Sequence, residues 1–205
     1  MAPSLAAVLL LAGLIACGSD PTAVSCEGAG TAGSDPGVTG EATAEMSIAD
    51  MLRAEPRFSR FRDLTIRTVS EGRGQSWLEI WDFEGSQMGD NREGVTVFVP
   101  TDAAFERLDP SLLEAIEGPD LDNEIRYNLL GHHYVHRLYP ESDFAAGPQR
   151  TWSGGGSVEM TTDPLTWGGC PIVETDVRLS NGYIHVVDGV VIPADLREAA
   201  ASDSS

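Results

Sequence analysis

Histidine is the residue type in this sequence best suited to catalysis or metal binding. Three of the four histidines, His132, His133 and His136, fall close together, and His185 lies nearer the C-terminus. On a helix His132 and His136 would share one face, but we predict that residues 132–139 are extended, where alternate residues share a side. A zinc site needs three or four converging ligands, and the sequence does not show such convergence. We therefore predict neither a metal nor a cofactor.

A short acidic run resembles the start of a calcium-binding loop. Asp120, Asp122 and Glu124 have the alternating spacing of the first ligands of an EF-hand. The sixth position of that loop should be glycine and is Ile125, and the twelfth should be glutamate and is Gly131. Acids at such positions suit the N-terminus of a helix, where the helix dipole is positive. We therefore predict a helix start here and no calcium site.

The composition excludes several classes of partner and chemistry. The 205 residues contain 32 Asp and Glu against 13 Lys and Arg, a formal net charge of −19, and none of the basic residues is lysine. A negative field of this size repels nucleic acid phosphates and anionic lipids, so we predict no nucleic-acid partner. Walker-type phosphate loops, Schiff-base amines and Ser-x-x-Lys sites all need a lysine. The acidity itself is typical of a hydrated surface, for example in a salty medium.

The sequence also lacks the local signatures of common enzymes. It contains no Gly-x-Ser-x-Gly, His-Glu-x-x-His or Cys-x-x-Cys motif. The glycine run at residues 153–157 resembles a phosphate cradle, but without lysine or a strand-to-helix context we interpret it as a hinge. A Ser–His–acid triad stays open, because its members can lie far apart in the chain. We predict that the protein is not an enzyme.

The N-terminal residues 1–17 have the pattern of a bacterial lipoprotein signal peptide. Leu5–Ala16 is an uncharged apolar run, shorter than the about 20 residues that span a bilayer but long enough for a signal-peptide core. It leads into Cys17 through Leu14 and Ile15, which resembles a lipobox, although no Arg or Lys precedes it. An ordinary secretory signal is the alternative. We predict that lipid on Cys17 anchors the protein in the cell envelope, at the outer membrane or cell surface.

Residues 18–45 are predicted to form a flexible tether between this anchor and a folded head. They are rich in Gly, Ser, Ala, Thr, Pro and acids, so the entropy lost on ordering them is not offset by burial. If Cys17 carries the lipid, Cys26 and Cys170 remain as a candidate disulfide that would pin part of the tether to the head. The alternative is two unpaired thiols.

The remainder is predicted to be one domain at 46–198, followed by a disordered tail at 199–205. Caps and apolar spacing predict helices at 47–52, 58–64, 101–108, 110–117 and 122–130. Apolar and β-branched runs predict strands at 95–99, 132–139, 158–160, 172–173, 177–179, 183–187 and 190–192. Helices come first and strands later, without β-α-β alternation, which indicates an α+β fold with a mixed or antiparallel sheet.

Aromatic residues gather in the two least regular regions. The run 77–83 holds Trp77, Trp81 and Phe83, and we interpret it as a strand pair or an exposed excursion. Trp152 lies in the second region. Aromatic side chains on loops are frequent binding anchors, and the alternative is a satellite core under a long loop.

Three segments resemble the signatures of the fasciclin (FAS1) domain. Val95–Leu108 reads VTVFVPTDAAFERL, and Asn181–Pro193 reads NGYIHVVDGVVIP. Between them, Leu129–Val135 reads LLGHHYV, with His133 in the family's histidine position and His132 in place of its usual tyrosine. The resemblance covers about residues 46 to 195. It implies a single domain, a wedge of two packed β-sheets flanked by several short helices.

The resemblance also implies structural roles and a function. The residues in the family's structural motif positions are Thr101, Asp102, Phe105, His133, Asn181, Gly182 and His185. Our leading hypothesis is a surface-displayed, lipid-anchored protein for cell adhesion, with an extracellular protein or polysaccharide as its partner. The speculative binding residues are His132, Tyr134, His136, Tyr139, Trp77, Trp81 and Trp152. The alternative is an envelope protein that binds a small lipid or glycan, which requires a deep apolar pocket instead of a shallow patch.

Overall fold

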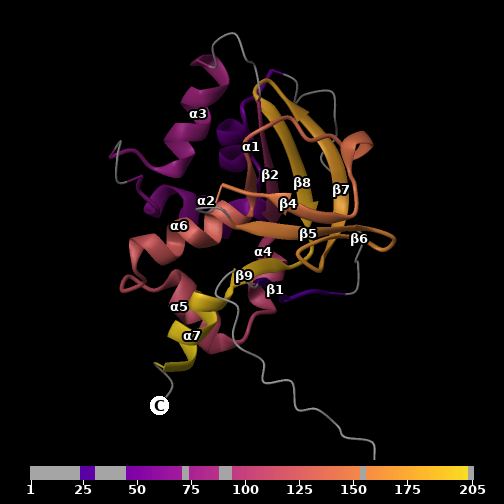
Figure 1. Cartoon of the computed structure of the whole chain (residues 1–205). Coiled ribbons are helices and arrows are strands. Elements are labelled where there is room, and N and C mark those ends of the chain that lie inside the picture. The colour runs from indigo at the N-terminus through magenta and orange to yellow at the C-terminus, as the bar shows by residue number, and fades with distance from the viewer. Residues whose placement is uncertain (1–23, 31–44, 71–73, 88–93, 153–155, 203–205) are drawn as a thin grey trace, which may run out of the picture.

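The computed structural model of the protein describes residues 24–30, 45–70, 74–87, 94–152 and 156–202 (Figure 1). The helices are α1 Ile48–Ala54, α2 Ser59–Arg67, α3 Trp77–Gln87, α4 Asp102–Glu106, α5 Pro110–Glu117, α6 Asn123–His132 and α7 Ala194–Ser202, with short 3-10 turns at Pro56–Phe58 and Glu141–Asp143. The strands are β1 Val24–Glu27, β2 Val95–Pro100, β3 Tyr134–Val135, β4 Gly147–Arg150, β5 Ser157–Thr162, β6 Leu165–Trp167, β7 Cys170–Leu179, β8 Gly182–Val187 and β9 Val190–Pro193.

The described strands form two sheets. The larger has the order β3-β2-β8-β7-β6-β5-β4, and β1 pairs with β9 in the smaller. Strands β2 and β8 are parallel, with Val97 opposite Ile184, while the other neighbouring strands of the larger sheet pair antiparallel. This arrangement confirms the predicted α+β class with a mixed sheet. It also places strands from all three signature segments side by side, in the order β3, β2, β8.

Alternation along β2 divides the interior into two hydrophobic clusters. Val95, Val97 and Val99 belong to the larger cluster, which they share with helices α1, α2 and α3. Phe98 points to the other face and belongs to a smaller cluster with Trp167. The two rings are stacked, with their centres 3.8 Å apart. All six residues of β2 are buried, as expected for a strand covered on both faces. Figure 1 shows α1, α2, α3 and α6 gathered on one side of β2 and β8.

Local capping explains where several helices begin. The hydroxyl of Ser47 accepts a hydrogen bond from the Asp50 amide, and the Asp50 carboxylate accepts one from the Ser47 amide. Asp109 caps α5, whose first residue is Pro110, and Asp122 caps α6. These contacts satisfy amide donors that a helix start leaves unpaired. The predicted helix starts at these acids are confirmed.

Two predictions of extended structure were wrong. The aromatic run is helix α3, neither a strand pair nor an excursion, because Ile80 and Trp81 recur at helical spacing from Trp77. In the segment 132–139 only Tyr134–Val135 is strand, since helix α6 continues through His132. The seven-residue LLGHHYV motif therefore crosses from a helix into a short strand.

The ends of the head also differ from expectation. Val24–Glu27, inside the predicted tether, is strand β1 and pairs along its whole length with β9. Strand β9 therefore lies in the smaller sheet with β1, whereas β8 lies in the larger sheet. Helix α7 runs to Ser202, into the predicted disordered tail. The two short strands predicted at 172–173 and 177–179 are one strand, β7, interrupted by register shifts.

Candidate functional site: an aromatic pocket beside helix α3

A small pocket of about 70 Å³ opens between helices α3 and α6 and the segment that follows β4. Its lining residues are Ser70, Trp77, Ile80, Trp81, Tyr127, Tyr134 and Trp152. None of these side chains carries a formal charge, and most are aromatic. We call this hollow the aromatic pocket.

The rings of the aromatic pocket pack mainly edge to face. Trp77 lies with its ring centre 5.0 Å from that of Tyr127, 5.3 Å from Tyr134 and 5.5 Å from Trp81. The ring centres of Trp152 and Tyr134 lie 5.8 Å apart, and the indole nitrogen of Trp152 donates a hydrogen bond of 2.7 Å to the Tyr127 hydroxyl. Edge-to-face contacts of this kind add to the energy of apolar burial. The walls of the pocket are therefore held in place by contacts among the lining side chains themselves.

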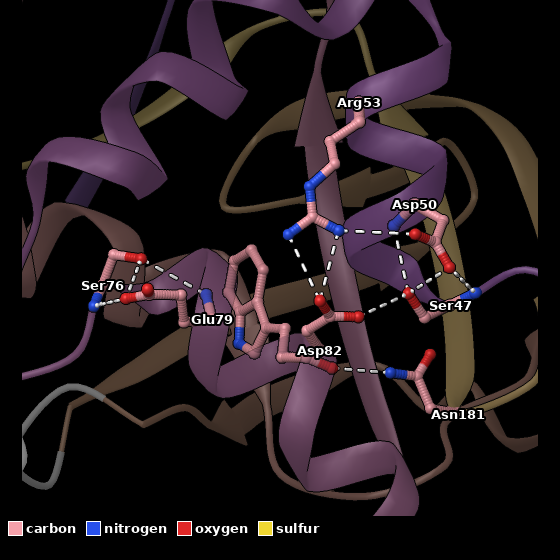
Figure 2. Close-up of polar contacts among 8 residues, drawn as sticks. Ser47, Asp50, Arg53, Ser76, Glu79, Asp82 and Asn181 are labelled. Atoms are coloured by element: carbon pink, nitrogen blue, oxygen red, sulfur yellow. Dashed lines mark hydrogen bonds and ion pairs between the residues drawn. The ribbon is translucent and has the colours of Figure 1, made fainter.

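A capping box places Trp77 at the first position of helix α3. The Ser76 hydroxyl accepts from the Glu79 amide, while the Glu79 carboxylate accepts from the Ser76 amide at 2.8 Å and the Ser76 hydroxyl at 2.9 Å (Figure 2). These contacts keep the pKa of Glu79 below its ordinary value. The Ser-x-x-Glu pattern at residues 76–79 was a readable signal for this helix, and our sequence analysis missed it.

Polar contacts anchor the next turn of α3 to helix α1. Arg53 forms hydrogen bonds of 3.3 Å with the carboxylates of both Asp50 and Asp82 (Figure 2). The Ser47 hydroxyl also donates to Asp82 at 3.2 Å. Exposed ion pairs contribute little stability, so these contacts link α3 to α1 without adding much to the free energy of folding. Trp81, next to Asp82, lines the pocket and has no exposed surface.

Most residues predicted to bind a partner are buried. The exposed fractions of Trp77, Trp81, His132, Tyr134 and Tyr139 are 2%, 0%, 3%, 2% and 0%. These five side chains therefore offer almost no surface to a partner, contrary to our hypothesis for them. For His132 and Tyr134 the reason is that the end of α6 and strand β3 pack these side chains inward, while the chain returns to the surface at His136.

Two of the predicted binding residues do reach the surface, and they lie together. His136 is exposed, and Trp152 is 42% exposed. Their rings pack edge to face, with their centres 5.1 Å apart. Tyr127 and Ser70, which we did not select from the sequence, complete the mouth of the pocket. The run of aromatic residues on α3 predicted part of the site, whereas the approach of Tyr127 depends on tertiary packing.

Two buried indole nitrogens, on residues that line the pocket, have no acceptor in the described part of the chain. Nε1 of Trp77 and Nε1 of Trp81 are buried without a hydrogen-bond partner in the described part of the chain. The indole nitrogens of Trp152 and Trp167 donate to Tyr127 and to the His132 carbonyl. A buried, unpaired donor costs about 1–3 kcal/mol, and such groups are often found where a ligand or water binds.

The signature segment after β2 has a structural role. The Thr101 hydroxyl caps α4 by accepting from the Ala104 amide at 3.3 Å. The Asp102 carboxylate accepts from the Ser59 hydroxyl at 2.6 Å and the Arg60 amide at 2.9 Å, so that it caps the start of α2 as well. Phe105 is 1% exposed and belongs to the larger cluster. These residues connect two helix starts to the core.

His133 and His185 are buried hydrogen-bonding residues. His133 Nδ1 lies 3.0 Å from the Leu129 carbonyl, and its Nε2 accepts from the Val191 amide at 3.2 Å. Burial lowers the pKa of His133 to about 4. His185 Nε2 lies 2.7 Å from the Tyr139 carbonyl, and burial lowers its pKa also. Both rings are therefore neutral near pH 7 and occupied by main-chain partners, which is unsuited to catalysis.

Asn181 lies in the turn between β7 and β8, and Gly182 is the first residue of β8. The Asn181 side chain accepts from the Ile48 amide at 2.9 Å and donates to the Trp81 carbonyl at 2.7 Å. A Cβ atom on Gly182 would overlap the Val95 carbonyl oxygen on the neighbouring strand. The start of β8 therefore requires glycine, because the backbone of β2 approaches it closely.

Cys26 and Cys170 form a disulfide that joins β1 to the start of β7. The bridge connects residues 144 positions apart in the sequence. It fastens the part of the predicted tether that pairs with β9. Cys17 and the apolar run before it lie outside the described residues.

Other candidate chemistry has little support in the described residues. No group of three or more His, Cys, Asp or Glu side chains there is placed to hold a metal ion. An open hollow of about 590 Å³ beside α2 contains charged residues, but its Arg60 pairs with Glu117 and Glu106 within the protein. No described helix has the length and apolar character needed to cross a membrane.

The α+β fold with its buried Asn181 and histidine motifs defines the class of domain, and comparison with known proteins identifies the family. A model of the fasciclin domain matches residues 78–193, which is more than half of the chain. The chain therefore belongs to the fasciclin domain family.

Three relatives from animals and plants are similar in sequence. Periostin of Homo sapiens is 29% identical over 155 residues, covering 74% of this chain and 16% of periostin. Transforming growth factor-beta-induced protein ig-h3 of Sus scrofa is 32% identical over 117 residues, covering 54% of this chain and 17% of that protein. Fasciclin-like arabinogalactan protein 6 of Arabidopsis thaliana is 28% identical over 130 residues, covering 54% of this chain and 49% of that protein. The chain spans less than half the length of each of these relatives.

A solved structure shows the same fold. A FAS1 domain pair from the insect cell adhesion molecule fasciclin I aligns with a TM-score of 0.50 at 17% identity, covering 74% of this chain and 51% of that one. At this identity the likeness concerns the fold alone.

Proposed function

We propose that the protein is a non-enzymatic adhesion module, displayed on the cell surface through lipid on Cys17, that binds an extracellular protein or polysaccharide. The observation that carries the proposal is the aromatic pocket with Trp152 at its mouth, in a fasciclin domain whose fold occurs in a cell adhesion molecule. Partly exposed aromatic side chains are common anchors at binding surfaces. In this proposal residues 18–23 and 31–44 remain tether, while β1 belongs to the head.

The size of the pocket favours recognition of a group over enclosure of a whole ligand. Sites that enclose a small molecule are typically about 300–1,000 Å³, whereas this pocket is about 70 Å³. It accommodates one projecting group of a larger partner. The alternative function as a carrier of an entire lipid or glycan is therefore less well supported.

The test is adhesion of beads coated densely with the purified protein to surfaces of matrix protein or polysaccharide. Dense display should raise the apparent affinity over that of the monomer by about 10²–10⁴-fold. Trp152→Ala should abolish most bead capture, since it removes the exposed ring of the pocket. Val173→Ala is the matched control, because Val173 is 43% exposed and lies on β7, outside the pocket lining.

Two outcomes of this assay would count against the proposal. A folded wild-type protein whose beads adhere to no surface would contradict the adhesive role. Equal capture by wild-type and Trp152→Ala beads would place the adhesive surface elsewhere on the domain.

A further inference from the structure

Strand β1 joins the chain to the head a short distance after the residue proposed to carry lipid. Val24, its first residue, comes seven positions after Cys17. An extended chain spans at most about 3.6 Å per residue, so the Cα atoms of these two residues lie within about 25 Å of each other. Met46, where we expected the head to begin, comes 29 positions after Cys17. That separation would allow a reach of up to about 100 Å.

Several independent contacts hold β1 on the head. All four of its residues pair with β9. The disulfide from Cys26 to Cys170 ties it to the start of β7, a strand of the larger sheet. Cys170 is fully buried, and Val24 and Cys26 pack against the smaller hydrophobic cluster to which Cys170 belongs. Detachment of β1 would therefore break a strand pairing, a covalent bond and apolar packing together.

The residue that follows β1 is held as well. The Gly28 carbonyl accepts a hydrogen bond of 2.8 Å from Arg107 Nε, and Arg107 also pairs with the Asp188 carboxylate between β8 and β9. Gly28 has a φ of +68°, and a Cβ atom there would overlap the Ala104 carbonyl oxygen on helix α4. The chain therefore leaves β1 in close contact with α4, a path that requires glycine.

These contacts determine which part of the chain sets the distance between lipid and head. Residues 31–44 lie between β1 and helix α1, and both of these elements belong to the head. The length of that connection has no effect on the distance from Cys17 to the head while β1 stays paired. Only residues 18–23 set this distance. Figure 1 shows β1 and β9 in the lower part of the molecule and α3, which carries pocket residues, at the top.

We propose that β1 is the attachment point of the head, and that it keeps the β1–β9 sheet within about 25 Å of the membrane surface. The end of the molecule that carries β1 is then nearest the lipid. A partner that binds the head must approach the bilayer closely, because residues 31–44 add no reach. This inference rests on the lipid anchor of the proposed function and is independent of its adhesive site.

The test compares two insertions of the same spacer, about 20 Gly and Ser residues long. The upstream variant carries it between Asp20 and Pro21, and the downstream variant carries it between Gly33 and Ser34. Each lipidated protein is purified from the producing cells and inserted into a supported phosphatidylcholine bilayer. Neutron reflectometry then measures the height of the head above the lipid.

The two insertions should have different effects. The upstream spacer should raise the head by about 10–25 Å, since a flexible chain of this length has a root-mean-square end-to-end distance of about 25 Å. The downstream spacer should leave the height of the wild type unchanged, because it lies between two parts of the head. Lengthening a loop costs little free energy, so both proteins should fold.

A further variant makes the downstream spacer effective. Replacing Val24–Glu27 by Gly and Ser, together with Cys170→Ser, removes both the pairing with β9 and the disulfide. The head should then rise, and the downstream spacer should raise it further. Circular dichroism would verify folding. The two insertions test the inference even where this variant does not fold, because they leave every described residue in place.

Different results would overturn the inference and the proposed function. Equal rises with the upstream and downstream spacers would overturn the inference, because residues 31–44 would then contribute to the reach. A height unchanged by the upstream spacer would overturn it as well. Wild-type protein that does not join the bilayer would overturn the lipid anchor and this inference together. The predicted heights in a protein whose coated beads adhere to no surface would overturn the adhesive function and support this inference.

Discussion

The side chain of Asn181 holds the main chain of Trp81, through a 2.7 Å hydrogen bond from its amide nitrogen to the Trp81 carbonyl. The same side chain accepts from the Ile48 amide at 2.9 Å. A buried residue just before β8 thus connects helices α1 and α3, across 100 positions in the sequence from Trp81. Because α3 carries two rings of the aromatic pocket, this residue of the family motif positions the candidate site.

Replacing Asn181 should therefore destabilise the fold. Asn181→Ala leaves the Ile48 amide without its acceptor and removes the side-chain donor to the Trp81 carbonyl, and we expect a loss of about 2–4 kcal/mol in the free energy of unfolding. Chemical denaturation measures this loss. Asn123→Ala is the matched control, because Asn123 makes two similar bonds to the main chain of Val69 at an exposed position. Equal losses in the two variants would contradict the account, since water can replace only the exposed bonds.

The disulfide should contribute a large share of stability. In the chain-entropy model a bridge between residues 144 positions apart is worth about 5 kcal/mol. The double variant Cys26→Ser/Cys170→Ser should lower the free energy of unfolding by up to this amount and expose the amides of β1 to hydrogen exchange. Wild-type protein unfolded under reducing conditions should match the variant. An unchanged free energy with β1 still protected would show that the β1–β9 pairing persists without the bridge.

Stability should fall in mild acid because His133 is buried as the neutral ring. Its pKa is about 4 in the fold and about 6.5 in the unfolded chain, so the unfolded state binds the extra proton between these values. Its contribution is complete above about pH 6.5 and is lost progressively down to about pH 4, amounting to about 3 kcal/mol. The lowered pKa values of His132 and His185 act in the same direction. Urea unfolding at several pH values measures the loss.

A His133→Asn variant provides the control for this pH dependence. It should be less stable at pH 7, because the Val191 amide loses its acceptor, and its stability should change less between pH 6.5 and 4. The lowered pKa values of carboxylates such as Asp50 affect stability only at lower pH. An equally steep pH dependence in the variant would assign the effect to groups other than His133.

Lipid attachment should depend on Cys17 alone. We expect Cys17→Ala to abolish incorporation of labelled fatty acid and to release the protein from the membrane fraction of the producing cells. The double cysteine variant of the disulfide should keep its label, because Cys26 and Cys170 are joined in the fold. Label retained in Cys17→Ala would contradict the proposed anchor.

The features that the sequence predicts well are those set by neighbouring residues. Thr101, Asp109 and Asp122 cap helices as expected, because a cap depends on the few residues that follow it. The buried strand β2 was equally evident from its run of β-branched residues. The same local reasoning should have found helix α3 through Ser76 and Glu79.

The features that the sequence does not predict depend on distant partners. Strand β1 lies in a polar stretch and is a strand because Val24 pairs opposite Pro193 at the far end of the chain. Tyr139 resembles a surface anchor in the sequence, but its amide bonds to Thr96 and its ring is enclosed. The pocket itself requires Tyr127 and Trp152 to meet across two separate elements. No local pattern specifies that meeting.

The most direct test of the central proposal is the binding of monomeric protein to whichever surface captures the coated beads. We predict saturable, rapidly reversible binding that is weakened about tenfold by Trp152→Ala and unchanged by Val173→Ala. Circular dichroism and thermal melting of the three proteins would verify that each is folded. Saturable binding that is lost in Val173→Ala and kept in Trp152→Ala would contradict an adhesive site at the aromatic pocket. The same conclusion would follow if the wild-type protein showed no saturable binding to any surface.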